Sequence, residues 1–117
     1  MFSIMCDEDK LKKICELSGK KMREIFGNKL VSVILYGSYA RGDYEEFSDI
    51  DIMALVDMDK MELGEYQWQV SCFLSDIDLE YDVLLSVHLQ DKETFDKWQY
   101  VLPFFVNVKK EGIVINA

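Results

Sequence analysis

Hydrophobic residues recur every three or four positions in the first part of the chain. Between Asp7 and Phe26 the apolar side chains are spaced by three, four and seven residues, with lysines between them, which predicts an amphipathic helix. Gly27 and Asn28 tolerate the left-handed conformation that ends many helices. Leu30–Tyr36 is rich in β-branched and apolar residues, so we expect a mostly buried strand there.

The middle of the chain predicts a strand, a helix and another strand. Asp49–Val56 alternates polar and apolar residues at its start and then becomes continuously apolar, as in a central strand with one polar end. A turn is expected over residues 57–59, and a helix within residues 61–79 with a candidate end at Asp76. We expect the third strand over residues 80–87.

The last third of the chain predicts short helices. Residues 91–99 have a helical pattern, and Pro103 suits the first position of a helix that continues to Lys110. Gly112 is expected to end that helix before an apolar tail, residues 113–115. Four aromatic residues lie close together in this part and are assigned mainly to the core, with docking of another protein as the alternative: Trp98, Tyr100, Phe104 and Phe105.

Length and composition restrict the class of protein. The 117 residues suffice for one domain with a modest core, and 50% of them are hydrophobic, which excludes a disordered chain. A net charge of −9 argues against direct binding to nucleic-acid backbones. The sequence has no basic leader and no apolar run long enough for a membrane span, and its three cysteines do not form a disulfide or zinc pattern. We therefore expect a cytoplasmic protein with reduced thiols and no membrane attachment.

The negative charge is concentrated in one segment. Residues 43–91 contain 14 acidic residues and one basic residue. A solvated acidic face would explain this segment, and so would a metal site, because Mg²⁺ prefers carboxylate oxygens and is often bound together with phosphates.

The Gly37-Ser38 pair follows the first strand, and after ten further residues Asp49-Ile-Asp51 opens the second. Gly37 lets backbone amides approach an anion closely, and the Ser38 hydroxyl can donate a hydrogen bond to a phosphate oxygen. Residues two apart in a strand point to the same face, so Asp49 and Asp51 can share a divalent cation. Arg41, between the two elements, either contacts phosphate or braces the loop through a carboxylate.

A third carboxylate is expected from the predicted third strand. Asp82 would share a face with Glu80, although Asp78 and Glu80 are neighbouring candidates for the same role. Three carboxylates around two metal ions would orient a triphosphate and activate an attacking hydroxyl. Ser48 is expected to shape the loop before the acidic pair, and His88 is assigned no role.

These elements resemble the signature of the polymerase-β-type nucleotidyltransferase superfamily. The Gly37–Gly42 and Ser48–Asp51 segments, together with the tail from Pro103 to Gly112, resemble its minimal nucleotidyltransferase (MNT) group. The resemblance implies one MNT domain over residues 1–117 with an α/β (α+β) fold, a small mixed sheet flanked by helices. It also implies ATP as co-substrate, two Mg²⁺ ions, and an acidic triad that is both catalytic and metal-binding, formed by Asp49, Asp51 and Asp82.

The same resemblance suggests a partner. Minimal members commonly act as antitoxins beside a small helical HEPN-domain ribonuclease toxin and silence it by transferring AMP to a toxin tyrosine. We therefore expect Mg²⁺-dependent transfer of AMP from ATP to a protein hydroxyl, with a HEPN toxin as the partner and with homo- or hetero-oligomers both open. The alternatives are a binding module that neutralises its partner stoichiometrically, and a nucleotidyltransferase with a small-molecule acceptor.

Overall fold

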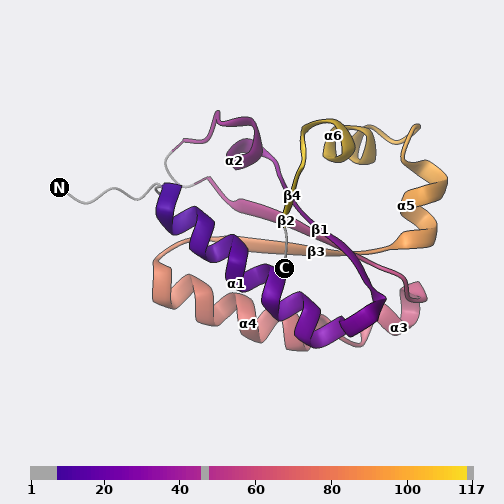
Figure 1. Ribbon diagram of the computed structural model, residues 1–117, viewed down its shortest axis with the longest axis horizontal. Helices are drawn as coiled ribbons and strands as arrows, with labels where there is room; N and C mark the ends of the chain where they lie inside the picture. Colours follow the sequence, from indigo (N-terminus) through magenta and orange to yellow (C-terminus); the bar gives the residue numbers. More distant parts are fainter. Residues whose placement is uncertain (1–7, 46–47, 116–117) are drawn as a thin grey trace.

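A four-stranded sheet forms the centre of the molecule in the computed structural model, which describes residues 8–45 and 48–115 (Figure 1). The strand order is β3-β2-β1-β4, with β2 and β3 parallel and the other neighbours antiparallel. This mixed sheet with flanking helices confirms the predicted fold class. The strands are β1 (Leu30–Tyr36), β2 (Ile50–Val56), β3 (Leu85–Asp91) and β4 (Ile113–Ile115).

Helices cover both faces of the sheet. The first predicted helix is confirmed, although Asp7 lies outside the described residues. After this helix, Gly27 has a positive φ of 56° and is the first residue of a short 3-10 helix, Gly27–Lys29. In Figure 1, α1 and α4 lie side by side below the strands, whereas α2 and α6 lie above them. The helices are α1 (Glu8–Phe26), α2 (Ser38–Arg41), α3 (Lys60–Gly64), α4 (Gln67–Tyr81), α5 (Lys92–Trp98) and α6 (Pro103–Glu111).

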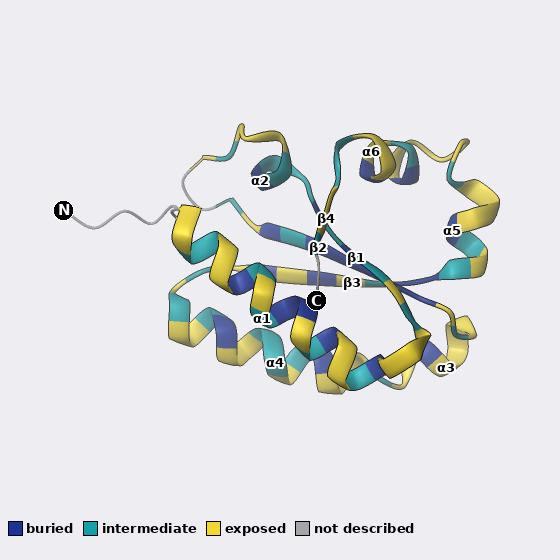
Figure 2. Cartoon of the chain, viewed as in Figure 1, coloured by how far each residue is buried: buried dark blue, intermediate teal, exposed yellow. Residues whose placement is uncertain are grey.

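The larger core lies between the sheet and the pair α1 and α4. Ile14 and Met22 of α1 and Val70 of α4 are completely buried there, against Ile52 of β2 and Val87 of β3. Figure 2 shows these helices with a buried stripe toward the sheet and an exposed stripe toward solvent. The spacing of apolar residues in the sequence therefore predicts which side of α1 faces the core.

A smaller core lies on the opposite face of the sheet. Because β2 is buried on both sides, it is continuously apolar after its first residues, with alternate side chains entering the two cores. Asp51 lies on the side of the smaller core, but at the end of β2 that α5 and α6 do not cover fully, so its side chain is half-buried. The buried residues of this smaller core are Met53, Leu55, Phe95, Phe105 and Val108.

The middle helix and the third strand differ from their predictions. The helix predicted over residues 61–79 is two helices, α3 and α4, and the strand predicted over residues 80–87 starts later. Helix α4 continues to Tyr81, because Tyr81 follows the buried Ile77 by one helical turn and packs against the same core. Asp82 then ends α4 in the left-handed conformation, with φ 54° and ψ 55°, and β3 begins at Leu85.

The end of the chain also departs from the sequence analysis. The apolar tail is strand β4, which pairs with residues 33–35 of β1. The assignment of the aromatic cluster to the core is wrong for three of its four members. Phe105 is buried, but Trp98, Tyr100 and Phe104 are 37%, 74% and 43% exposed. Pro103 begins α6 as predicted.

In residues 8–45 and 48–115 no helix is both long enough and apolar enough to cross a lipid bilayer.

Asp91 connects the end of β3 to the start of α5. One carboxylate oxygen accepts a hydrogen bond from the backbone N–H of Thr94 at 2.9 Å, and the other accepts one from the Gln90 side chain at 3.1 Å. Burial alone would raise the pKa of Asp91, but hydrogen bonds from the side chain and backbone of Thr94 outweigh it, so the pKa is lowered. A lowered folded-state pKa means that the ionised form stabilises the fold.

We expect Asp91→Ala to lower the free energy of unfolding by about 1–2 kcal/mol at pH 7, because it removes the helix cap. Asp91→Asn is the matched control, because it keeps an oxygen acceptor and loses only the charge. The stabilisation is present above the ordinary Asp pKa of about 4 and is lost as the pH falls through the lower folded-state value. Urea denaturation at pH 7 and about pH 3 measures this; an equal effect at both pH values would contradict it.

Candidate active site

The Gly37-Ser38 turn packs directly against a carboxylate of the acidic pair. Gly37 has φ 76° and ψ −157°, a conformation that residues with a side chain rarely adopt. A Cβ atom at Gly37 would lie 2.5 Å from Oδ2 of Asp51, which is closer than any real contact. The backbone conformation therefore favours glycine at this position, and a methyl group there would displace the end of the Asp51 side chain. The spacing of the motif brings these two residues together across β1 and β2.

Asp49 and Asp51 form a pair of like charges at the start of β2. Asp49 is exposed and precedes the strand, whereas Asp51 is half-buried within it. Burial raises the pKa of Asp51, the negative charge of Asp49 raises it further, and the positive charge of Arg41 lowers it. A half-buried carboxylate with a second carboxylate beside it is a place where a bound cation would be stabilised.

Tyr36 stands beside Asp51 and was missed by the sequence analysis. It is the last residue of β1 and is in register with Asp51 on β2, so the two side chains share a face. Burial raises the pKa of Tyr36 to about 12, and the nearby charge of Asp51 adds to this effect. Tyr36 is therefore a neutral hydroxyl at neutral pH. Its ring packs edge-to-face with that of Phe104, with 5.5 Å between the ring centroids, and this contact joins the site to α6. Its position as the last residue of the strand, immediately before Gly37, could have located it.

Arg41 braces the turn through carboxylates, one of the two roles expected for it. Its guanidinium lies 3.1 Å from Asp43 and 3.3 Å from Glu111, and these contacts raise its pKa. The contact with Glu111 connects α2 to the end of α6. Beside it is a cavity of about 210 Å³, lined also by Tyr36 and Gly37. The sequence analysis missed Glu111, because 70 residues separate it from Arg41.

The two serines of the motif have different positions. Ser38 is the first residue of α2, and its carbonyl accepts hydrogen bonds from the N–H groups of Gly42 and Asp43. Ser48 has the predicted turn role, because its hydroxyl oxygen accepts a hydrogen bond from the N–H of Glu45 at 2.8 Å. Ser48 thus shapes the loop that leads into the acidic pair.

Asp82 is not brought to the pair by the strand that was predicted to carry it. It is exposed at the end of α4, and β3 places Ser86 opposite Asp51 instead. Across residues 8–45 and 48–115 no three His, Cys, Asp or Glu side chains come close enough together to hold a metal ion. The described site therefore contains two carboxylates, and the role of Asp82 as a metal ligand stays a prediction.

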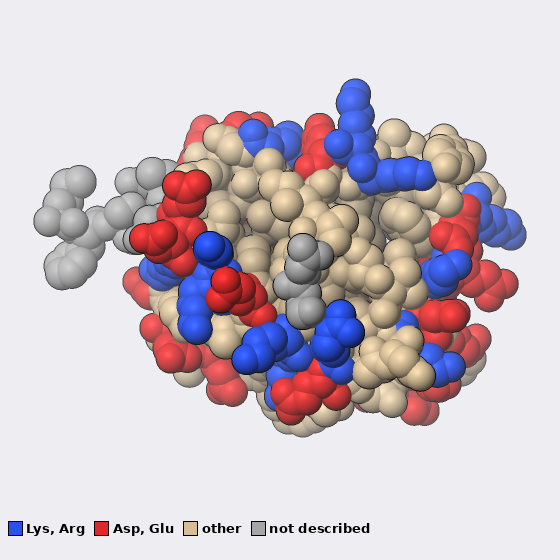
Figure 3. All heavy atoms as spheres, viewed as in Figure 1, with Lys and Arg blue, Asp and Glu red and all other residues tan. Residues whose placement is uncertain are grey.

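Most of the acidic segment is solvated surface. Among its described acidic residues only Asp51, Asp78 and Asp91 are shielded from solvent. Figure 3 shows acidic and basic side chains interspersed over the lower half of the view, where α1 crosses the molecule. Most acidic residues of the segment therefore form a solvated face, as one explanation predicted. Two of them, Asp49 and Asp51, form the carboxylate pair beside Gly37, where the other explanation predicted a metal site.

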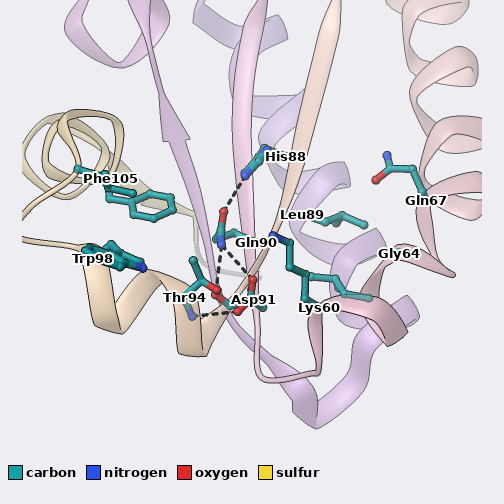
Figure 4. A pocket seen from close by; sticks show the side chains of 12 residues that line it. Lys60, Gly64, Gln67, His88, Leu89, Gln90, Asp91, Thr94, Trp98 and Phe105 are labelled. Atoms are coloured by element: carbon teal, nitrogen blue, oxygen red, sulfur yellow. Dashed lines mark hydrogen bonds between the residues drawn. The ribbon is translucent and has the colours of Figure 1, made fainter.

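A second cavity lies away from the acidic pair. It has a volume of about 440 Å³ and opens beside the end of β3, between α3 and α4 on one side and α5 and α6 on the other. Figure 4 shows Gln90 and Asp91 at its floor, with Trp98 and Phe105 on one wall. His88 borders it, with its Nε2 atom 2.8 Å from the side-chain oxygen of Gln90. The His88 ring also packs against Phe104, with 5.7 Å between the ring centroids, and Phe104 in turn packs against Tyr36.

We expect Gly37→Ala to destabilise the protein and to distort the site, because the added methyl group collides with Asp51. Gly42→Ala is a matched control: Gly42 also has a positive φ, 83°, but a Cβ there meets nothing within 4 Å. Both variants carry a backbone strain of about 1–3 kcal/mol, and only Gly37→Ala carries the collision in addition. Thermal unfolding and titration with Mg²⁺ and ATP measure the difference. Equal losses in the two variants would show that the contact with Asp51 is unimportant.

Comparison with known proteins identifies relatives. The family model of the nucleotidyltransferase domain matches residues 11–113. The chain is 42% identical over 67 residues to the Methanocaldococcus jannaschii protein named "Putative protein adenylyltransferase MJ0141", covering 57% of this chain and 66% of that protein. It is 32% identical over 97 residues to "Putative protein adenylyltransferase MJ0604" of the same organism, covering 80% of this chain and 86% of that protein.

A solved structure has the same fold. The crystal structure of a toxin-antitoxin with AMP-PNP matches with a TM-score of 0.50 and 22% identity, covering 87% of this chain and 73% of that chain. At this identity the likeness concerns the fold alone. The matched residues 11–113 include the Gly37-Ser38 turn and the Asp49 and Asp51 pair, so the site described above lies within the matched region. This chain belongs to the nucleotidyltransferase domain family, and it is a nucleotidyltransferase.

Proposed function

We propose that the protein transfers AMP from ATP to a tyrosine hydroxyl of a partner protein. The observation that carries the proposal is the contact between the Gly37 backbone and the Asp51 carboxylate. It brings a turn suited to phosphate next to a carboxylate suited to a cation, which is the combination that a nucleoside triphosphate with its metal requires.

The residues present fit Mg²⁺. This ion is usually bound by one or two carboxylates together with substrate phosphates, rather than by a complete cage of protein ligands. Asp49 and Asp51 supply two carboxylates. Burial and the charge of Asp49 raise the pKa of Asp51, and a bound cation would offset both effects. When bound, Mg²⁺ would neutralise the charge of the phosphates and of the leaving pyrophosphate.

The proposed reaction exchanges one phosphorus–oxygen bond for another. The tyrosine oxygen forms a bond to the α-phosphorus of ATP, and the bond from that phosphorus to the oxygen bridging to the β-phosphate breaks. This oxygen leaves as part of pyrophosphate, and the phenolic proton passes to solvent. In this step Ser38 and the backbone beside Gly37 would hold the phosphates, Arg41 would supply positive charge, and Asp49 and Asp51 would hold the metal.

Two observations support a protein as the acceptor. The relatives at 42% and 32% identity are both named as protein adenylyltransferases. The cavity lined by Tyr36, Gly37 and Arg41, about 210 Å³, is smaller than the roughly 300–1,000 Å³ of sites that enclose a small-molecule substrate. An acceptor that supplies its own binding surface suits such a site.

The partner in this proposal is a HEPN-domain ribonuclease toxin, which the transfer would silence, with this protein as the antitoxin. The fold is shared with a toxin-antitoxin structure that contains AMP-PNP, an ATP analogue. The exposed aromatic residues Trp98, Tyr100 and Phe104 favour a second candidate, a module that neutralises the toxin by binding alone. The two candidates differ in whether silencing needs the acidic pair.

We expect the Asp49→Asn/Asp51→Asn double variant to lose AMP transfer by about 100-fold or more while remaining folded, because metal binding contributes several kcal/mol to transition-state stabilisation. The measurement is intact mass of a HEPN toxin after incubation with the protein, ATP and Mg²⁺. Asp57→Asn/Asp59→Asn is a control with the same loss of charge at the far end of β2. Full silencing of the toxin by the Asp49/Asp51 variant without a gain in mass would establish the binding module instead.

The metal-ligand role predicted for Asp82 and its position at the end of α4 give opposite expectations for Asp82→Asn. From the position we expect activity within about tenfold of the natural protein. The variant's free energy of unfolding should change by less than about 0.5 kcal/mol, because Asn also tolerates the left-handed conformation at this helix end. Steady-state kinetics with varied Mg²⁺ test this. A loss equal to that of Asp51→Asn, with a raised Mg²⁺ requirement, would establish Asp82 as the third ligand.

A further inference from the structure

Strand β3 forms one edge of the sheet and presents peptide groups to the outside. The carbonyl of Leu84 accepts a hydrogen bond from β2, whereas the N–H of Leu85 faces the other way and donates to Asp78 at 2.8 Å. Because this direction alternates along a strand, the peptide groups of Val87 and Leu89 also face outward. Nothing in the described part of the chain pairs with these two, so the edge is open beyond Leu85.

The open edge is long enough to pair with another chain. β3 has seven residues, whereas protected edge strands are usually short, bulged or covered. Ser86 and His88, whose side chains lie on the face of the smaller core, are both exposed. An extended segment added here would form the fifth strand of the sheet, a common mode of peptide recognition.

Such a segment would be in register with the acidic pair. Ser86 lies directly opposite Asp51 on the neighbouring strand, so a residue paired with Ser86 would point to the same face as Asp51. Two strand spacings separate it from Asp51, roughly 10 Å. The Ser86 side chain between them is small and exposed, and Phe104, whose ring contacts Tyr36 and His88, borders the path. A phosphate held at the acidic pair would lie between the two residues, so the hydroxyl has to cover only part of this distance. Among side chains that end in a hydroxyl, tyrosine reaches furthest, whereas serine and threonine are too short.

The same edge leads into the large cavity at the end of β3. Gln90, on the same face as Ser86 and four residues further along, lies at the cavity floor (Figure 4). Trp98 and Phe105 form an apolar wall beside it. A residue four positions from the paired tyrosine would therefore enter this cavity, and an apolar side chain fits it.

The charge around this edge indicates the composition of the segment. Between Met61 and Asp91 the chain has no Lys or Arg, and Asp76, Glu80 and Asp82 are exposed on the end of α4 that leads into β3. Basic residues near the tyrosine would complement these carboxylates, and association would be faster at low salt.

We propose that the open edge of β3 binds the acceptor protein, as an extended basic segment whose tyrosine pairs with Ser86 and whose apolar residue four positions away fills the cavity beside Trp98. This inference rests on the proposed function and specifies its substrate: the sheet edge selects tyrosine by the distance to Asp51. The bond exchange is the one written above for the tyrosine oxygen and ATP.

Amide hydrogen exchange tests the docking, with a short lysine-rich peptide that carries one tyrosine and a leucine four positions away. With about 1 mM peptide, roughly ten times a Kd of about 0.1 mM, we expect exchange at Val87 and Leu89 to slow by about tenfold. Exchange at Leu85, already bonded to Asp78, should not change. A peptide with serine in place of tyrosine should protect the same amides. Unchanged exchange at Val87 and Leu89 would overturn the proposal.

AMP transfer to the peptide tests the register in which its tyrosine pairs with Ser86. The measurement is the intact mass of the peptide after incubation with the protein, ATP and Mg²⁺. We expect the tyrosine peptide to gain one AMP and the serine peptide to gain about 100-fold less. Ser86→Phe should block the path and reduce transfer by at least about tenfold, whereas Ser75→Phe, which adds the same ring at an exposed position of α4, should not. Equal transfer by both variants would overturn the register.

The experiments distinguish a failure of the docking proposal from a failure of the proposed function. Transfer of AMP to a protein tyrosine without protection of Val87 and Leu89 would leave the function in place and remove the docking edge. Protection of both amides without any transfer to the tyrosine would retain the edge as a binding surface and contradict the proposed transfer.

Discussion

The contact between the backbone of Gly37 and the carboxylate of Asp51 is the constraint on which the rest of the site depends. A side chain at Gly37 would displace this carboxylate, since a Cβ would come within 2.5 Å of its oxygen. The pairing of β1 with β2 fixes this contact, because Tyr36 is in register with Asp51. The turn and the carboxylate therefore cannot shift relative to each other without breaking the centre of the sheet.

The two faces of the sheet have different roles: one holds most of the core, and the other carries the candidate active site. The face toward α1 and α4 is closed and holds most of the buried apolar side chains. The face toward α5 and α6 has a smaller core, which leaves the ends of β1 and β2 partly open. A half-buried carboxylate such as Asp51 is costly, because burial and the charge of Asp49 both disfavour its ionisation. The larger core offsets this cost, and the open face gives a substrate access to the pair.

Much of the fold and the centre of the site could be predicted from the sequence. The apolar periodicity of α1, the β-branched run of β1 and the proline that begins α6 are local signals, and local signals decide where helices and strands form. The motif is also a local signal: it consists of Gly37-Ser38, ten further residues, and then Asp49 and Asp51, and it predicted the candidate site. A strand end followed by a flexible residue, and two acids two apart, need no knowledge of distant parts of the chain.

The rest was decided by tertiary structure. Residues 80–84 alternate like a strand, but packing of Tyr81 against the core extends α4 and leaves Asp82 at its end. Neither the pairing of Arg41 with Glu111 nor the position of Ser86 opposite Asp51 has a signal in the sequence, since each depends on the register of distant segments. The sequence by itself determined which residues form the turn and the acidic pair. Only the folded sheet decided what stands beside them, because a shift of one residue in strand register changes every neighbour.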